Sequence, residues 1–546
     1  MRWTNALVYA TLSGLTAYAS QFPVGAPDTE DSHIDVPRGD YGSHGRQWRF
    51  DETPAVNATG HLVFETVSSL LQHWPNTRYR NGHTLVPGVV PPGTLLYHGT
   101  TQKVVPNRPE WLATDPEHSH VFCRGTVEAG CWHLTLATTR PLHVLYLDGS
   151  SAAKMKGGPM DSQDIVAWGE FRDDWTFNER QRIVDLCEWG QQYSLDGFLR
   201  MEQDFEVMLC NFTSGVKVAS FLNLPDLSII DRGKPPSQVF RTFEMMNGGH
   251  WHNRYPGEGR AHLDLSRLIS FYDVDLVPSL VAQRFGQERW DHRLSGADAA
   301  DIVAVRARLA DVLTEKQTSS GVDWRTLFHV IVDRYADRLE LLQYLINDTD
   351  TRSESRQDSR ERAAKAQLQL RIMLTPYILH SSVPSSHSEH PTAGFSWAEP
   401  VFRECATMHT DIIVTDFTHA LTPSERLLLQ AIQETTREIC RVVVRMWAEG
   451  VETGLDSYLP MKAEVPDVTA VMAKWSDDLN GLMAWLDWSI YQLNDRFCSQ
   501  EMCYLPTWPV GFQRRRRPDQ PPEPEDDEEW KRPQPKCIRR VDPYGF

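Results

Sequence analysis

Positive charge is scarce in this chain. Its 55 Lys and Arg residues are outnumbered by 73 Asp and Glu residues, which gives a formal net charge of -18 at pH 7. Proteins hold nucleic acids and anionic membranes with concentrated positive charge, so neither partner is expected. One basic run, Arg514–Arg517, is followed by acidic residues that offset it. We interpret this run as a dibasic processing site, which an intact-mass measurement on secreted material would test.

Long hydrophobic runs and the common catalytic motifs are also missing. After the N-terminal segment no run of about 18 apolar residues occurs, so no membrane span is expected. The chain has no CxxC, no Gly-x-Ser-x-Gly and no P-loop. Zinc ribbons, thioredoxin-type sites, serine hydrolases with a nucleophile elbow and P-loop phosphotransferases therefore lack motif support.

The N-terminus has the pattern of a secretory signal peptide. Arg2 supplies the positive start, a moderately apolar segment follows, and Ala17-Tyr18-Ala19 gives a small-x-small cleavage pattern. Acceptor sequons for N-glycosylation, which suit passage through a glycosylating compartment, occur at Asn57, Asn211 and Asn347. We therefore expect a secreted, extracellular glycoprotein.

Nine cysteines in an oxidising compartment allow up to four disulfides with one thiol left over. Cys123 and Cys131 flank a glycine-containing turn and are expected to close a hairpin. Cys498 and Cys503 are a second local candidate pair. Further pairing cannot be read from the sequence.

The chain is rich enough in apolar residues to fold, since 41% of it is hydrophobic and 10% aromatic. Composition and periodicity divide it into six parts. The expected order is a signal peptide (1–20), a flexible leader (21–58), an α+β domain (59–235), a connecting aromatic and polar region (236–290), a helical domain (291–510, with a loop at 381–394) and a disordered charged tail (511–546).

Short apolar runs in the first half predict strands, and a period of about 3.6 residues in the second half predicts helices. The expected strands are 94–97, 132–136, 143–147, 165–168, 197–201 and 205–210. The expected helices are 61–73, 178–191, 297–316, 324–347, 360–379, 424–450 and 468–493. Thr422-Pro423-Ser424-Glu425 is a capping box with proline at the first helical position, which fixes one helix start.

Two strings place polar residues at the ends of apolar strands. In Tyr97-His98-Gly99-Thr100 a histidine precedes a glycine, which lets a ligand or another backbone come close. The alternative is a core histidine that leads into a turn. In Trp111–Asp115 the residue Thr114 either faces a cleft or caps a helix that starts at Pro116.

A third string carries acidic residues. Asp196-Gly197 forms a turn into a strand on which Glu202, Asp204 and Glu206 fall at period two and so share one face. They are either the solvated side of an edge strand or part of a site. A fixed carboxylate suits chemistry through an oxocarbenium ion, because it stabilises positive charge beside a ring oxygen.

Taken together, the order and spacing of the three strings resemble the ADP-ribosyltransferase-like fold. In that family a first strand carries His or Arg, a second a small hydroxyl or aromatic residue, and a later strand a catalytic glutamate. The resemblance covers about residues 90–220. It implies an α+β fold with an N-terminal mixed-sheet domain followed by a mainly α-helical domain.

The resemblance implies NAD, or another nucleotide sugar, as substrate. His98, with Gly99 and Thr100 beside it, would hold the ribose and nicotinamide end, and Thr114 would brace the site. Glu206 would stabilise the cationic ribose and orient the nucleophile of an unspecified acceptor.

Asp204 would assist Glu206, although Glu or Gln is usual at its position. Thr114 lacks the flanking serine of the usual Ser-Thr-Ser. The whole chain is also similar to a group of secreted filamentous-fungal proteins with no assigned activity. That likeness is carried by the strings at 160–165, 251–256 and 333–338.

Two other functions compete with NAD-dependent ADP-ribosyl transfer or NAD hydrolysis. One is a secreted interaction protein that keeps the fold without the chemistry. The other is a glycosidase that uses a pair drawn from Asp161, Asp164 and Glu170. The His-x-His pairs at 118/120 and 250/252 lack a third ligand at a characteristic spacing, so no metal is predicted.

Overall fold

The fold is described from a computed structural model. The residues that it describes are 48–123, 130–155, 157–224, 245, 249, 251–253, 255–314, 318–347, 356–383, 393–458, 468–492, 501–504 and 532–539. The predicted signal peptide, the loop at 384–392 and the basic run at 514–517 lie outside these residues.

The first half of the chain forms a mixed ten-stranded sheet. Its order is β10-β1-β5-β6-β7-β3-β2-β4-β8, with β9 also paired to β1. Of the pairings between these strands, β5 with β6 is parallel and the others are antiparallel. The strands are β1 (Thr84–Val90), β2 (Leu95–Thr100), β3 (Glu110–Ala113), β4 (Cys131–Thr138), β5 (Leu142–Leu147), β6 (Gly197–Met201), β7 (Phe205–Leu209), β8 (Val216–Leu224), β9 (His262–Leu263) and β10 (Ile269–Ser270).

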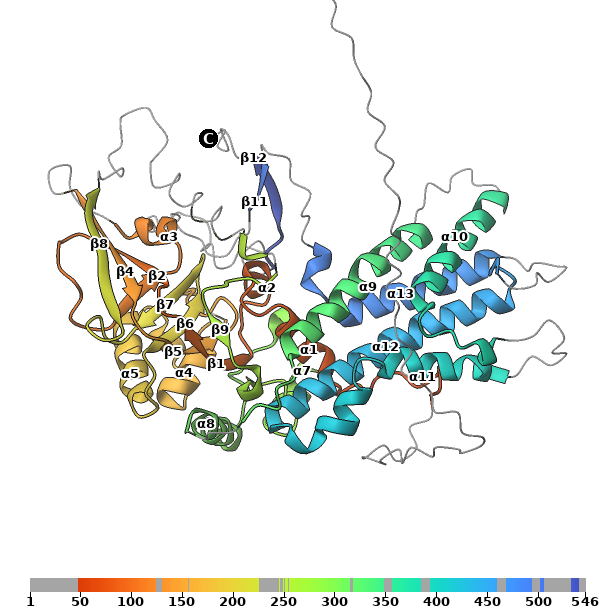
Figure 1. Ribbon diagram of the computed structural model, residues 1–546, viewed down its shortest axis with the longest axis horizontal. Helices are drawn as coiled ribbons and strands as arrows, with labels where there is room; N and C mark the ends of the chain where they lie inside the picture. The colour runs from red at the N-terminus through yellow and green to blue at the C-terminus, as the bar shows by residue number, and fades with distance from the viewer. Residues whose placement is uncertain are drawn as a thin grey trace, which may run out of the picture. The chain divides into compact units, whose positions relative to one another are not determined.

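Both faces of the sheet are covered, because inner strands such as β5 carry apolar residues on both sides. Leu145 and Leu147 of β5 pack with the helices α4 (Asp161–Trp168), α5 (Glu179–Gln191) and α8 (Ala299–Thr314). Figure 1 shows these three helices together on one side of the sheet. Val144 and Tyr146 belong to a second core that begins with α1 (Gly60–Ser68) and continues into the helices of the second half.

The second half is helical. Helices α9, α10, α12 and α13 pack on one another, as Figure 1 shows. The helices of this part are α9 (Trp324–Asn347), α10 (Arg356–Leu374), α11 (Glu399–Thr407), α12 (Pro423–Glu452) and α13 (Val468–Leu486). The predicted capping box is confirmed, since the Thr422 hydroxyl accepts from the Glu425 N–H and the Glu425 carboxylate accepts from the Thr422 N–H.

The α+β layout predicted from the sequence is therefore confirmed. The strand predicted at 165–168 is wrong, because these residues end helix α4. The sheet also continues past residue 235, since β9 and β10 come from the region interpreted as a connector.

Two predicted flexible or disordered segments contain described residues that differ from expectation. Residues 48–58, predicted as part of the flexible leader, include Trp48 and Phe50, which pack on Phe402 of α11. The charged tail includes β12 (Lys536–Arg539), which pairs with β11 (Glu501–Tyr504) and sets the backbone of Cys503 opposite Cys537. Cys498 of the predicted pair Cys498–Cys503 lies outside the described residues.

Three disulfides join described residues. Cys123–Cys131 closes the hairpin that the sequence predicts. Two others, Cys187–Cys210 and Cys405–Cys440, join the end of α5 to the end of β7 and α11 to α12. In the described part of the chain no helix has the length and hydrophobicity needed to cross a membrane.

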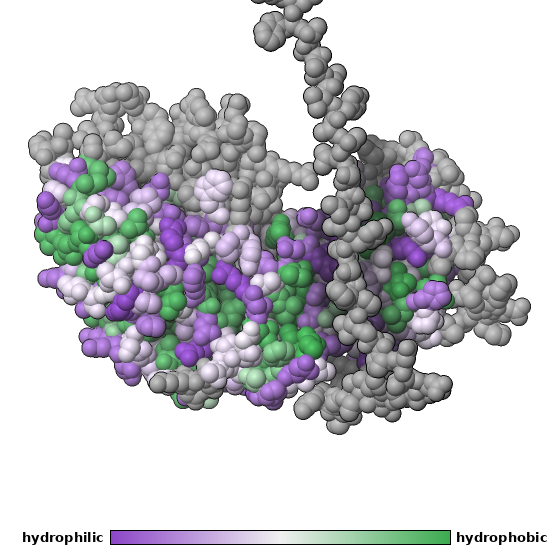
Figure 2. Space-filling model, viewed as in Figure 1, coloured by the Kyte–Doolittle hydropathy of each residue, from purple (hydrophilic) through white to green (hydrophobic). Residues whose placement is uncertain are grey.

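The edge strand β8 exposes Val218 and Leu222. Hydrophobic colour gathers on that side of the molecule in Figure 2.

Candidate active site

The sheet opens between β2 and β3. The two strands share one bridge, Tyr97 with Ala113, whereas β3 continues alongside β7 from Glu110 to Ala113. A pocket with a volume of about 290 Å³ lies at this opening. Another pocket, with a volume of about 390 Å³, lies in a different part of the molecule. The pocket at the opening is lined by Tyr97, His98, Gly99, Glu110, Trp111, Ala113, His118, Ser119, Phe122, Lys154, Glu179, Glu202 and Glu206. The three strands that carry the sequence motifs are thus neighbours around one pocket.

Glu206 is a deeply placed acid of this pocket, with 3% of its surface exposed. In β7 it lies opposite Ala113 of β3 and opposite Arg200 of β6. Arg200 Nε donates to Glu206 Oε1 over 2.8 Å. The guanidinium also donates to Gln163 over 2.9 Å and to Glu179 over 2.5 Å. This cross-strand ion pair holds the Glu206 carboxylate in one orientation.

A second cation, Lys154, lies close to the carboxylates of this network. Lys154 Nζ is 3.0 Å from Glu202 and 4.0 Å from Glu179. Burial by itself lowers the pKa of Lys154, but the charges of Glu202 and Glu179 outweigh it and raise the pKa. Each carboxylate that lines the pocket therefore has a cationic partner: Glu202, Glu179 and Glu206 pair with Lys154 or Arg200, and Glu110 pairs with Arg108 and Arg180.

His98 presents a neutral ring to the pocket. Its Nδ1 lies 2.8 Å from the Trp111 carbonyl oxygen, which can only accept, so Nδ1 carries the proton. Burial lowers the pKa of His98 more than the contact with Trp111 raises it. The neutral ring with a protonated Nδ1 leaves Nε2 with a free electron pair that can accept a hydroxyl hydrogen bond.

Aromatic side chains line the walls. Tyr97, Trp111 and Phe122 line the pocket together with His118 of α3 (Pro116–Val121). The Trp111 Nε1 and His118 Nδ1 atoms are buried without a hydrogen-bond partner in the described structure. Buried polar atoms are normally satisfied, so these two are suited to a polar ligand.

Gly99 is needed where β2 meets the end of α3. A Cβ atom at this position would overlap the carbonyl oxygen of Ser119 and lie 2.7 Å from the Cys123 nitrogen. The close approach keeps Ser119 and Phe122 at the pocket, beside β2.

Three of the predicted site residues do not line this pocket. The Thr114 hydroxyl donates to the Phe205 carbonyl over 3.0 Å, and Ala113 is the β3 residue opposite Glu206. Asp204 does not share a face with Glu206, because 202–204 are the turn between β6 and β7 and not part of a strand. Thr100 is partly exposed at the end of β2 and does not line the pocket.

Asp204 belongs instead to a buried cluster with Asp115, His252, Glu258 and Arg260. Arg260 donates to Asp115 over 3.0 Å and to Glu258 over 2.6 Å. His252 lies 2.8 Å from Asp115. Burial opposes protonation of His252, but Asp115, Asp204 and Glu258 raise its pKa to about 9. Burial raises the pKa of Asp204 well above its usual range.

Ligand atoms of Asp115, His252 and Glu258 lie within 4.8 Å of one another, which suits a metal ion by distance. The Arg260 guanidinium already lies against both carboxylates, and a protonated His252 is not a metal ligand. The cluster therefore fits an internal charge balance better than a metal site.

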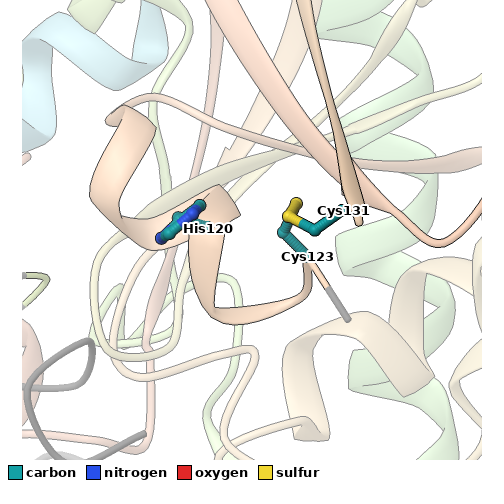
Figure 3. A group of neighbouring side chains, drawn as sticks. All are labelled: His120, Cys123 and Cys131. Carbon is teal, nitrogen blue, oxygen red and sulfur yellow. A yellow bond between two sulfur atoms is a disulfide. The ribbon is translucent and has the colours of Figure 1, made fainter. Parts of the chain in front are cut away.

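A second group with metal-like spacing is His120 with Cys123 and Cys131, shown in Figure 3. The two sulfur atoms are joined as a disulfide and are not thiolates. His250, which forms a His-x-His pair with His252 in the sequence, lies outside the described residues.

The carboxylates considered for a glycosidase do not form a pair in this pocket. Asp161 pairs with Arg293 at 2.9 Å, and Asp164 pairs with Arg182. Glu170 has a side chain that is 63% exposed and pairs with Arg172 at 2.8 Å. None of the three lines the pocket at the β2–β3 opening.

Sequence reasoning missed Arg200, Lys154 and Glu179. For Arg200 a signal existed, since a three-residue turn at 202–204 sets position 200 opposite position 206. Lys154 and Glu179 reach the pocket through long-range packing, for which the sequence carries no local signal.

A family model matches the part of the chain that holds most of the sheet. The family described as the YPL277C N-terminal domain matches residues 54–132 and 126–238. The uncharacterised protein YOR389W of Saccharomyces cerevisiae is 23% identical over 384 residues, which cover 54% of this chain and 60% of that protein. The uncharacterised protein YPL277C of the same yeast is 24% identical over 385 residues, covering 54% of this chain and 77% of that protein. The chain thus spans about 60% of the length of the first relative. No solved structure matches.

Proposed function

We propose that the pocket binds the nicotinamide and ribose end of NAD and catalyses ADP-ribosyl transfer or NAD hydrolysis. The observation that carries this proposal is that His98 and Glu206, on strands β2 and β7, line one pocket beside β3. A volume of about 290 Å³ is at the low end for small-molecule sites, which suits one end of a dinucleotide.

In the proposed reaction the bond between ribose C1′ and the nicotinamide nitrogen breaks. Its electron pair stays on nicotinamide, which leaves as a neutral molecule, and the ribose becomes an oxocarbenium ion. Glu206 stabilises that positive charge, because its carboxylate is held in place by Arg200 before the charge develops. Water or an acceptor hydroxyl then attacks C1′ and releases its proton through a pocket carboxylate to solvent.

The remaining pocket residues have supporting roles. The free electron pair on His98 Nε2 suits a ribose hydroxyl, and Trp111 Nε1 suits the carboxamide oxygen. The aromatic walls favour the cationic nicotinamide ring over a neutral or anionic one.

The test is nicotinamide release from NAD by the full chain, followed by chromatography. We expect Glu206→Gln to lower the rate by roughly 100-fold or more while NAD still binds, because the charge is lost at nearly constant shape. Glu170→Gln, at an exposed acid outside the pocket, is the matched control. A Glu206→Gln variant that keeps its fold and its full rate of release would contradict the proposal.

A non-catalytic interaction protein is the second candidate. It is favoured by Ala113, which leaves the position opposite Glu206 without the hydroxyl that the resemblance predicts. NAD binding by calorimetry without any nicotinamide release would support this second function.

We also propose that the protein is secreted. The three disulfides and the exposed sequons at Asn57 and Asn211 support this location. Recovery of the glycosylated chain from culture medium would test it.

A further inference from the structure

A second and larger pocket lies at the junction of α1, α7 (Ser279–Arg284) and the end of α13. Its volume is about 390 Å³, and it shares no lining residue with the candidate active site. Segments far apart in the sequence build it, namely 56–62, 281–292 and 484–487. It therefore exists only in the folded chain, and the proposed NAD chemistry makes no use of it.

Two arginines of this pocket are held rigidly while part of each guanidinium has no partner. Arg284 lies 4.4 Å from the centre of the Tyr272 ring and donates through Nη2 to the Phe271 carbonyl over 2.9 Å. Arg289 lies 3.9 Å from the centre of the Tyr79 ring and donates through Nη2 to Thr66 over 2.8 Å. The Nε and Nη1 atoms of both are buried without a hydrogen-bond acceptor.

Two histidines beside these arginines are neutral. His292 is 5% exposed, its Nδ1 is 3.2 Å from the Tyr272 hydroxyl, and its Nε2 is buried without a partner. Burial and the charges of Arg284 and Arg289 lower the pKa of His292 to about 3. His61 stacks on Trp485 with ring centres 4.3 Å apart, and burial and Arg289 lower its pKa to about 3.

The acids around the pocket are engaged elsewhere or lie at its rim. Asp487 accepts from Arg78 and from the Tyr79 hydroxyl. Glu288 has a side chain that is 61% exposed and lies 3.2 Å from Arg532. Glu65 accepts from the Ser489 N–H, and burial raises its pKa. The acids near the two arginines therefore have other partners or are exposed to solvent.

We propose that this pocket is a binding site for a small oxyanion, the phosphate or carboxylate group of a small molecule. The Nε–H and Nη1–H bonds of a guanidinium point to different sides, so each arginine offers single charge-assisted donors to the oxygens of such a group and not a bidentate pair. His292, which also lines the pocket, is 5% exposed and adds a further buried atom, Nε2, without a hydrogen-bond partner. An oxyanion would satisfy donors whose burial is otherwise costly.

The test is equilibrium dialysis of the full chain with labelled inorganic phosphate at an ionic strength of about 0.15 M, which screens non-specific attraction. We expect binding at one site, weakened roughly tenfold by Arg284→Gln and by Arg289→Gln, since each removes a charge-assisted hydrogen bond. Arg426→Gln, at an exposed position of α12, should leave binding unchanged. Acetate in competition separates a phosphate site from a general carboxylate site.

Thermal stability provides a second readout for variants that fold less well. Phosphate should raise the melting temperature of the native chain and of Arg426→Gln but not that of Arg284→Gln. Arg284→Lys keeps the charge and loses the guanidinium's fixed donor geometry, so its affinity should lie between those of the native chain and Arg284→Gln. Phosphate binding that is equal in the native chain, Arg284→Gln and Arg289→Gln would overturn the proposal.

Discussion

At the scale of single residues, charge is buried where the chain folds back on itself. The β6–β7 hairpin carries Arg200 on one side and Asp204 at its turn, and each belongs to a different buried cluster. Removing one member of a buried ion pair leaves an uncompensated charge, which costs far more than the pair itself contributes. Removing a charged side chain from either cluster should therefore lower the stability of the fold.

Arg200→Met should lower the free energy of unfolding by about 3–5 kcal/mol, because Glu206 would keep its charge without a buried partner and Glu179 would lose its nearest one. Urea denaturation measures the change. Arg180→Met removes an exposed pair with Glu110 and should cost less than about 1 kcal/mol. Similar losses of unfolding free energy in both variants would show that the Arg200 network stabilises the fold no more than an exposed ion pair does.

His252 predicts a pH dependence of stability. Its pKa rises from 6.5 to about 9 on folding, so its stabilising effect is complete below pH 6.5 and is lost as the pH rises through 9. We expect the stability difference between the native chain and His252→Gln to shrink by about 3 kcal/mol over this window. The exposed His419 on η9 (Thr418–Ala420) is the control, and His419→Gln should follow the native profile. A pH-independent difference would contradict the assignment.

At the scale of elements, the capping box fixes the start of α12, the longest helix described. Thr422→Ala removes the acceptor for the Glu425 N–H and also the hydrogen bond to the Ser266 carbonyl. We expect a loss of about 1–2 kcal/mol in unfolding free energy, measured by urea denaturation. Thr314→Ala, at the exposed end of α8, should change stability little. If Thr422→Ala and Thr314→Ala changed the unfolding free energy equally, the capping box would not stabilise α12.

Long periodic elements could be predicted from the sequence, because their own residues determine them. The helix predicted at 324–347 matches α9, and the helix predicted at 178–191 matches α5 within one residue. The short apolar run at 165–168 was ambiguous, since a buried helix and a strand have the same composition over four residues. Tertiary packing decided in favour of the helix.

For the same reason, only part of the candidate site could be predicted from the sequence. His98 and Glu206 end up at one pocket because their strands flank β3, which their order along the chain suggested. Asp204 was misplaced because period-two counting ran through a turn that contains no glycine or proline to mark it. The contacts of Lys154 and Glu179 join residues that are distant in sequence and have no local pattern.

At the scale of the whole molecule, one hydrophobic core runs from the sheet into the helical half. It includes Tyr146 and Val207 of the sheet, Phe64 of α1, and Phe328 and Val443 of the helices, all nearly inaccessible to solvent. Two parts that share a core cannot expose it separately without losing the apolar burial that stabilises both. The helical half is therefore part of the same cooperative unit as the candidate site.

Removal of the Cys405–Cys440 disulfide tests this cooperativity. Cys405→Ala with Cys440→Ala should cost about 2–4 kcal/mol, because the closed loop between α11 and α12 is no longer constrained in the unfolded chain. If the core is shared, hydrogen exchange should accelerate in β5 as well as in α12, although the disulfide touches no strand. In the reciprocal variant, Cys187→Ala with Cys210→Ala, hydrogen exchange in α12 should accelerate to the same extent for each kcal/mol of unfolding free energy that is lost. Exchange that accelerates in α12 alone would show that the sheet and the helices unfold independently, and the pocket at the β2–β3 opening would then owe nothing to the helical half.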